Sequence, residues 1–213
     1  MEITWYGHAC FRLRERDLIV LTDPYDKSIG YALPRMRADI VTVSHASPGH
    51  NFVAAVKGEP KVLEGPGEYE ISGAFVTGIP SWHGRKRGGE RLPNTIFLFE
   101  LDGLTVCHLG GLGQVPTQTQ IEAMSAISVL LIPVGDGDHL DASEAAEVIG
   151  ALEPNIVVPM LYRLPVLTVN LDPVGKFLKE MGLPEVEPQE SLKVSKGSLP
   201  EETQVVVLAA RQS

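Results

Sequence analysis

The sequence predicts an α/β protein, and three features of the chain carry this prediction. The first half, up to about residue 108, consists of short runs of β-branched and apolar residues separated by turn residues. The second half alternates amphipathic helical segments with apolar strands, which is typical of βαβ units. The third feature is the segment 39–44, which is apolar enough for burial on both faces and is followed at once by His45.

The first half is expected to be mostly β-structure. Asp102-Gly103 is a two-residue hairpin signal between the last two predicted strands. The predicted strands lie near Ile3–Tyr6, Phe11–Leu13, Leu18–Leu21, Ile40–Val43, Val62–Leu63, Tyr69–Ile71, Phe75–Ile79, Thr95–Leu101 and Thr105–Cys107.

Two capping boxes mark helix starts in the second half. Thr117 with Gln120 precedes apolar residues at helical spacing, and Asp141 with Glu144 begins a helix over Ala142–Leu152. Residues 183–200 carry prolines and glutamates with little periodicity, so we expect an ordered surface connection or a flexible element rather than a domain linker. The remaining predicted elements are strands at Val129–Pro133, Ile156–Val158 and Val205–Leu208, and a helix at Pro173–Met181 ended by Gly182.

Length and composition predict one soluble domain spanning residues 1–213. The chain has 44% hydrophobic and 21% charged residues, and no apolar run approaches the roughly 20 residues that cross a bilayer. The first residues enter a strand without a signal-peptide pattern, so a cytoplasmic location and no membrane partner are expected. The net charge of −9 disfavours nucleic acid as a partner. Cys10 and Cys107 fit buried free thiols.

The loop after segment 39–44 has histidines at both ends, in the run Val-Ser-His-Ala-Ser-Pro-Gly-His at 43–50. Because this loop follows the carboxyl end of a buried strand, His45 lies where open α/β folds place chemistry. Two histidines five residues apart are also common in ordinary loops, where they bind backbone groups. The loop alone therefore leaves both interpretations open.

This run resembles the His-x-His-x-Asp-His signature of the metallo-β-lactamase superfamily. Other segments, in the same order along the chain, are similar to its lactonase-like branch, which is related to ascorbate-phosphate lactonase. The resemblance extends from about Met1 to Leu178. It rests on Ile3–Leu13, on Leu18–Pro24, on Gly-Ile-Pro-Ser-Trp-His-Gly at 78–84, on Val-Cys-His-Leu-Gly-Gly-Leu-Gly at 106–113, and on Asn-Ile-Val-Val-Pro-Met-Leu-Tyr at 155–162.

The resemblance implies an αββα four-layer sandwich and a metal centre with a depleted ligand set. Family members bind two zinc ions that activate a water molecule. Three of seven ligand positions keep a histidine here: His45, His50 and His83. The other four carry Ser47, Gly49, Gly111 and Leu161. We therefore expect these three histidines to be the metal ligands and the catalytic residues, holding at most one Zn or Mn ion, and a dinuclear centre is not expected.

Supporting roles around the centre are expected for His8, Asp23 and His108. Asp23 could orient a histidine or cap the turn at Pro24, and capping is the expected role. His108 is expected to be structural. His139 is expected in a solvated loop, where Asp136 or Asp138 offers an alternative carboxylate.

The basic loop after His83 is a candidate anion-binding element. Arg85, Lys86 and Arg87 could contact a phosphate or carboxylate of the substrate, although a solvated charged turn explains them equally simply. The predicted function is metal-dependent hydrolysis of an anionic ester, lactone or phosphodiester. The alternative is a non-catalytic protein whose former active-site cleft binds a small molecule or a protein partner.

Overall fold

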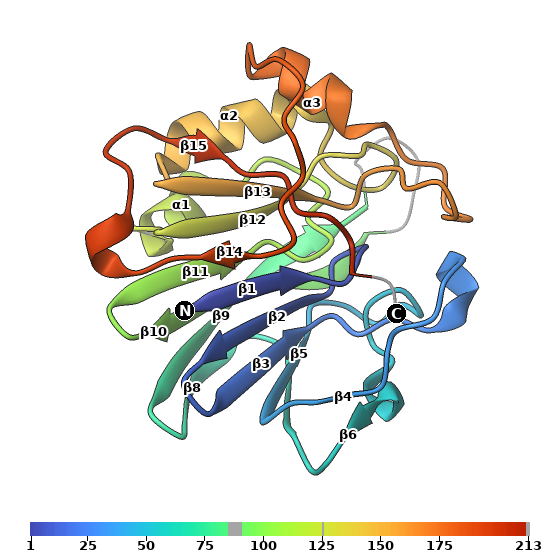
Figure 1. Cartoon of the computed structure of the whole chain (residues 1–213), viewed down its shortest axis with the longest axis vertical. Helices are drawn as coiled ribbons and strands as arrows, with labels where there is room; N and C mark the ends of the chain where they lie inside the picture. The colour runs from blue at the N-terminus through green and yellow to red at the C-terminus, as the bar shows by residue number, and fades with distance from the viewer. Residues whose placement is uncertain (85–90, 125, 212–213) are drawn as a thin grey trace.

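The computed structural model describes residues 1–84, 91–124 and 126–211. Two β-sheets face each other (Figure 1). The main hydrophobic core lies between them. This core joins side chains of both sheets, including Trp5 and Phe11 from the first and Phe97 and Phe99 from the second. The predicted α/β sandwich of two facing sheets is confirmed.

The first sheet has six strands in the order β14-β1-β2-β3-β5-β7. The strands β3, β5 and β7 run parallel, and the remaining neighbours pair antiparallel. Their bounds are Glu2–Trp5 for β1, Phe11–Glu15 for β2, Leu18–Thr22 for β3, Ile40–Val43 for β5, Lys61–Glu64 for β7 and Leu192–Lys193 for β14.

The second sheet has seven strands in the order β15-β13-β12-β11-β10-β9-β8. The strands β8 to β11 form an antiparallel meander, whereas β11, β12, β13 and β15 run parallel. Their bounds are Gly67–Ile71 for β8, Ala74–His83 for β9, Leu92–Leu101 for β10, Leu104–His108 for β11, Val129–Pro133 for β12, Ile156–Met160 for β13 and Gln204–Val205 for β15.

The two outer layers differ. Helices α1 (Gln118–Ala123), α2 (Ala142–Leu152) and α3 (Val174–Glu180) lie on the side of the second sheet (Figure 1), and both predicted capping boxes are present. A smaller apolar cluster that includes Tyr25 and Val41 covers the first sheet. In the described part of the chain, this side carries the 3₁₀ turns η1 (Lys27–Ile29) and η2 (Val53–Ala55) and the pair β4 (Met36–Arg37) and β6 (Val56–Lys57), while η3 (Lys196–Ser198) follows β14.

The structure departs from the predicted elements mainly near the C-terminus. The segment expected to be a connection contains β14, which pairs with β1. Only the first residue of the predicted closing strand Val205–Leu208 belongs to β15, while Leu208 forms an isolated bridge with Gln189. Two-residue strands such as these carry too few residues to show a period of two, which explains why the sequence did not reveal them.

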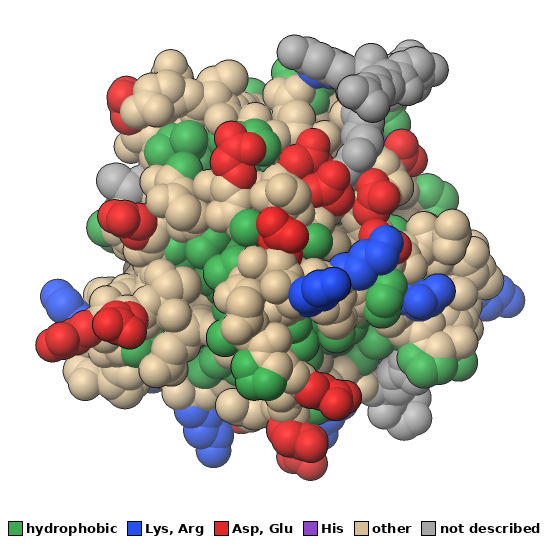
Figure 2. Space-filling model, turned by 90° about the horizontal axis from the view of Figure 1, so that it is seen from above, with side chains coloured by type: hydrophobic (Ala, Val, Ile, Leu, Met, Phe, Trp, Pro, Cys, Tyr) green, Lys and Arg blue, Asp and Glu red, His purple; other side chains and the backbone are tan. Residues whose placement is uncertain are grey.

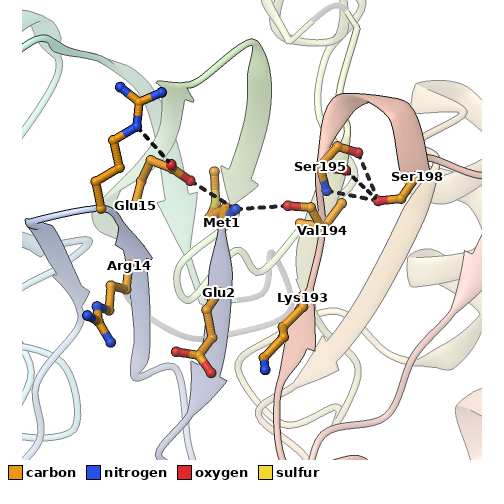
Figure 3. A pocket seen from close by; sticks show the side chains of 9 residues that line it. Met1, Glu2, Arg14, Glu15, Lys193, Val194, Ser195 and Ser198 are labelled. Carbon is orange, nitrogen blue, oxygen red and sulfur yellow. Dashed lines mark hydrogen bonds and ion pairs between the residues drawn. The ribbon is translucent and has the colours of Figure 1, made fainter.

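The N-terminal ammonium group also stabilises the sheet next to the pairing of β1 with β14. The Met1 ammonium group donates to the Val194 carbonyl at 2.9 Å and pairs with a Glu15 carboxylate oxygen at 2.9 Å, as Figure 3 shows.

On the face seen in Figure 2, acidic side chains are interspersed with basic and apolar ones, in keeping with the net charge of −9. None of the helices in the described residues has the length and apolar character needed to cross a bilayer.

Candidate metal centre

Five of the six histidines of the chain form one continuous row of rings, here called the histidine row. Adjacent ring centroids are 4.8 Å apart for His8 and His50, 4.0 Å for His50 and His45, 4.3 Å for His45 and His83, and 5.2 Å for His83 and His139. The sequence places these residues as far as 131 positions apart (139 − 8). The fold therefore gathers the three predicted ligands, together with two further imidazoles.

The row lies where strand ends from the two sheets meet. His45 follows β5 of the first sheet after one residue, and His83 is the last residue of β9 in the second sheet. The two sheets are joined at this point by the Thr95 amide, which donates to the Ser44 carbonyl at 2.8 Å. The turn between β1 and β2 contributes His8, and the loop before α2 contributes His139.

Asp23 fixes the orientation of His50. Its carboxylate accepts hydrogen bonds from the Ser44 amide at 2.7 Å, the Ser44 hydroxyl at 2.6 Å and His50 Nδ1 at 2.8 Å. The expected capping of the turn at Pro24 is therefore wrong, because the side chain points to the buried histidines rather than back to its own turn. Burial raises the pKa of Asp23, while neighbouring imidazoles and the Ser44 hydrogen bonds lower it again.

His45 and His83 are also held through Nδ1. The Ser44 hydroxyl uses its proton for Asp23, so its oxygen accepts from His45 Nδ1 at 3.0 Å. His83 Nδ1 donates to the Gly111 carbonyl at 2.7 Å. Together with His50, all three predicted ligands carry their proton on Nδ1, which leaves the lone pair on Nε2. Protein acceptors that fix the tautomer in this way are typical of histidines that bind a metal.

The buried imidazoles are neutral at physiological pH. Burial lowers the pKa of His8, His45 and His50 below the ordinary value, and the neighbouring histidines lower it further. For His45 the pKa falls to about 2. Neutral imidazole is the form that binds a metal ion.

Imidazole rings lie against Gly49 and Gly111, the two positions where the resemblance would place carboxylates. A Cβ atom built on Gly49 would lie 2.7 Å from His8 Nε2. A Cβ atom built on Gly111 would lie 2.5 Å from His45 Cε1 and 2.9 Å from His83 Nδ1. An aspartate at either glycine would have to displace these rings, so the residues present do not fit a dinuclear centre.

The donor set fits one ion in its chemistry, although the rings are not arranged around a single point. Three neutral imidazoles are a known ligand set for zinc. Within residues 1–84, 91–124 and 126–211, no group of three or more histidine, cysteine or acidic side chains has the geometry of a completed metal site. To bind one ion, the stacked rings would have to rotate until their Nε2 atoms point to a common centre. The buried His8 Nδ1 has no hydrogen-bond partner, which adds one unsatisfied nitrogen to the row.

A cavity of about 280 Å³ opens onto the histidine row. Ser47 and Gly49 line it from the loop after β5, and Asp138 lines it beside His139. The predicted substrate contacts Arg85, Lys86 and Arg87 lie outside the described residues.

His139 is buried, so the expected solvated loop is wrong. Only 6% of the residue is exposed. Its loop is pinned to the centre because the Asp138 carbonyl accepts from the Gly84 amide and the Leu140 amide donates to the Leu112 carbonyl. These backbone contacts join segments that are far apart in the sequence. The polar residues around His139 therefore did not predict its burial.

His108 is structural, as predicted. Its Nε2 donates to the Ala9 carbonyl at 2.9 Å, and its Nδ1 accepts from the Gly110 amide at 3.3 Å. These bonds connect the end of β11 to the turn before β2, and the ring is fully buried. Cys10 and Cys107 are buried free thiols, as predicted.

The backbone around the row is strained at three non-glycine residues. His8, Asp23 and Leu161 have φ angles of +52°, +40° and +53°. This left-handed region is unfavourable for side chains with a Cβ atom, and such residues cluster at functional sites. The Leu161 amide donates to the His8 carbonyl at 3.2 Å. The Leu161 side chain is fully buried in the main core.

The comparisons with known proteins agree with this fold. Residues 2–161 match the model of the beta-lactamase superfamily domain. A crystal structure from Thermotoga maritima, assigned to Zn-dependent hydrolases of the metallo-β-lactamase superfamily, aligns with a TM-score of 0.80 and 38% identity over 97% of both chains. The chain belongs to the metallo-β-lactamase superfamily.

Relatives of this superfamily member carry a common name. A UPF0173 metal-dependent hydrolase of Carboxydothermus hydrogenoformans is 27% identical over 83% of this chain and 90% of its own length. A protein of the same name from Pyrococcus abyssi is 27% identical over 76% of this chain and 84% of its own length. The predicted superfamily is thereby confirmed. The individual ligand assignments remain predictions.

Proposed function

We propose that this superfamily member is a metal-dependent hydrolase that works with a single divalent ion, Zn or Mn, held by His45, His50 and His83. The observation that carries the proposal is their common tautomer. Each Nδ1 donates to an acceptor of the chain, so each Nε2 lone pair is left for an ion. The names of the relatives support the reaction class.

Each residue of the centre would have a definite part in this function. When bound, the ion would supply a Lewis acid and lower the pKa of a coordinated water. Asp23 would hold His50 and, through Ser44, His45 in their metal-binding tautomers. The cavity of about 280 Å³ would hold the reacting group of an anionic ester, lactone or phosphodiester, with Arg85, Lys86 and Arg87 as candidate contacts for its charge.

Metal titration tests the proposal directly. Protein stripped with chelator and then supplied with Zn or Mn should bind about one equivalent, measured by elemental analysis and by competition with a chromophoric chelator. His45→Ala should weaken binding by at least about 100-fold, since a ligand is lost. His108→Gln is the matched control, because His108 lies outside the histidine row and should leave the affinity unchanged.

Hydrolysis provides the second readout. Turnover of bis-p-nitrophenyl phosphate or of a lactone should require the ion and disappear with chelator. Failure of the wild-type protein to bind Zn or Mn at micromolar concentration would contradict the proposal.

The second candidate is a non-catalytic protein that keeps the cleft for binding. The rings that occupy the carboxylate positions, together with the buried Leu161, favour this candidate, because they remove the second ion. A melting curve separates the two functions: stabilisation by small molecules without any response to Zn or Mn would favour the binding protein.

A further inference from the structure

A second cavity lies on the other side of His45, and we call it the side pocket. It has a volume of about 440 Å³, which is in the range of sites for small organic ligands. His45 lines both this pocket and the cavity at the histidine row. A molecule in the side pocket would therefore lie next to one of the proposed metal ligands.

The walls of the side pocket are flat and apolar. Pro80 and Trp82 are two residues apart on β9, and their cross-strand partners on β10 are Thr95 and Pro93. Residues at this spacing point to the same face of a sheet, so these four side chains form one surface. Pro66 and Leu92 add to the apolar lining.

Trp82 differs from the other tryptophan of the chain in its exposure. It is 42% exposed, whereas the other tryptophan, Trp5, is 1% exposed in the core. An exposed indole in a concave apolar site is the kind of side chain that anchors a ligand. Together with Leu92, which is 39% exposed, it places two of the large exposed apolar side chains at this one cavity.

The polar groups at the base of the pocket are already satisfied by the protein. Asn94 donates to the Ser81 hydroxyl and the Leu109 carbonyl and accepts from the Gly111 amide. The Ser81 hydroxyl donates to the Asn94 carbonyl, and the Ser44 hydroxyl donates to Asp23. Because these groups already bond to the protein, an apolar ring could lie against them without breaking a hydrogen bond.

One charge lies at the rim of the pocket. Glu64 is exposed, lines the pocket, and makes no ion pair with any side chain in the described ranges. The loop that follows it approaches β9 closely, since a Cβ atom on Gly78 would lie 2.7 Å from the Gly65 carbonyl oxygen. A carboxylate beside an apolar site favours a ligand that carries a cationic or hydrogen-bond-donating group.

We propose that the side pocket binds a small molecule made of an aromatic ring system and a cationic or donor group, with the ring against Trp82 and the polar group toward Glu64. The role of this molecule as part of a substrate rests on the proposed hydrolase function; its binding does not. The proposal thus names a substrate class, namely an ester, lactone or phosphodiester with an aromatic substituent beside the reacting group.

Calorimetry with three matched probes tests the pocket on metal-free protein. The probes are 1-naphthylmethylamine, 1-naphthalenemethanol and 1-naphthoate, which share the ring and differ in charge at pH 7. We expect the amine to bind roughly 3- to 10-fold more tightly than the naphthoate, because an exposed charge pair has a modest effect. Glu64→Gln should remove this preference and leave the affinity for the alcohol unchanged.

Two variants of β9 separate specific from general binding. Trp82→Ala should weaken all three probes by at least about 10-fold, and Trp82→Phe should retain part of the affinity if the ring acts by stacking. Phe75→Ala is the control, because Phe75 is 52% exposed on the same strand and does not line the pocket. In the wild-type protein, quenching of the exposed Trp82 by the amine gives a readout that needs no variant.

The outcomes distinguish this inference from the proposed function. No binding of any probe at millimolar concentration, or equal binding to wild type and a folded Trp82→Ala, would overturn the side pocket even if the protein binds zinc. Probe binding that depends on Trp82 would support it even if the protein binds no metal. If aryl esters are hydrolysed, Trp82→Ala should raise KM for them and leave KM for methyl acetate unchanged.

Discussion

The family resemblance divides the candidate metal centre into two halves with opposite characters. In the retained half, around His45, His50 and His83, every imidazole is held through Nδ1 by a buried partner. In the second half, around Gly49, Gly111 and Leu161, the space is filled by rings or by apolar packing. Hydrogen bonds orient the side chains of the retained half, whereas the second half is organised by packing.

This difference shows what a metal site needs besides its ligands. Partners such as Asp23 and Ser44 fix a tautomer whether or not an ion is present, so they keep the retained half organised. Leu161, at a position where the resemblance expects a histidine ligand, is instead packed in the main core. The comparison can be tested from both sides by substitutions that weaken one half and leave the other intact.

The largest effect is expected for Asp23→Ala. This substitution leaves three buried donors without an acceptor, so the free energy of unfolding should fall by about 3–5 kcal/mol. Urea unfolding measures the change. Asp26→Ala is the control, since Asp26 is an exposed cap of η1 and its loss should shift the midpoint far less. Equal shifts for both variants would show that Asp23 does not organise the retained half.

Leu161→Ala should act only on stability. Removing a fully buried leucine side chain costs roughly 2–5 kcal/mol through lost contacts and the cavity left behind. Metal affinity should stay within error of the wild type, because the lost half holds no ion. A loss of metal binding in a folded Leu161→Ala protein would break the division between the two halves.

Acid should destabilise the protein through the neutral histidines. The pKa values of His8, His45 and His50 lie below that of an unfolded histidine, near 6.5, so the unfolded chain binds more protons below that pH. The stability is complete above about pH 6.5 and falls below it, by about 1.4 kcal/mol per pH unit for each such group. Unfolding curves of the metal-free protein between pH 7.5 and 5 should show this slope. His45→Gln should lower the slope by the contribution of one histidine, about 1.4 kcal/mol per pH unit. A flat profile would contradict the neutral row.

The smallest effect is expected for Ser44→Ala. The hydroxyl links Asp23 to His45, so its loss should release the His45 tautomer and weaken metal binding by about 10-fold. Competition titration measures the affinity, and Ser81→Ala provides a control hydroxyl that bonds outside the row. A Ser44→Ala protein with unchanged affinity would mean that the orientation of His45 comes from packing instead.

The fold could be predicted from the sequence where elements are long or carry a local signal. Helix α2 begins and ends at the predicted residues because its capping box and helical spacing are both encoded in eleven consecutive positions. The buried strand before His45 was equally clear. By contrast, β14 is only two residues long and depends on pairing with β1, which lies about 190 positions earlier.

Only those residues of the centre were predicted that occupy known positions in the sequence motifs of the metallo-β-lactamase family. His45, His50 and His83 were expected to converge, and their rings do lie together. The burial of His139 was not foreseen, and the bond from His50 to Asp23 was only the less favoured of two alternatives, since both depend on contacts between segments far apart in the chain. The side pocket was missed for the same reason, because its walls come from three separate hairpin and loop regions.

The pairing of β1 with β14 has a consequence for biosynthesis. Strand β1 gains its neighbour on that side only when residues 192–193 have left the ribosome, so β1 exposes an open sheet edge while the residues between the two strands are synthesised. Such an edge can pair with other chains. A pause of translation before residues 192–193 have emerged should therefore increase recruitment of chaperones to the nascent protein, whereas a pause after they have emerged and paired with β1 should not.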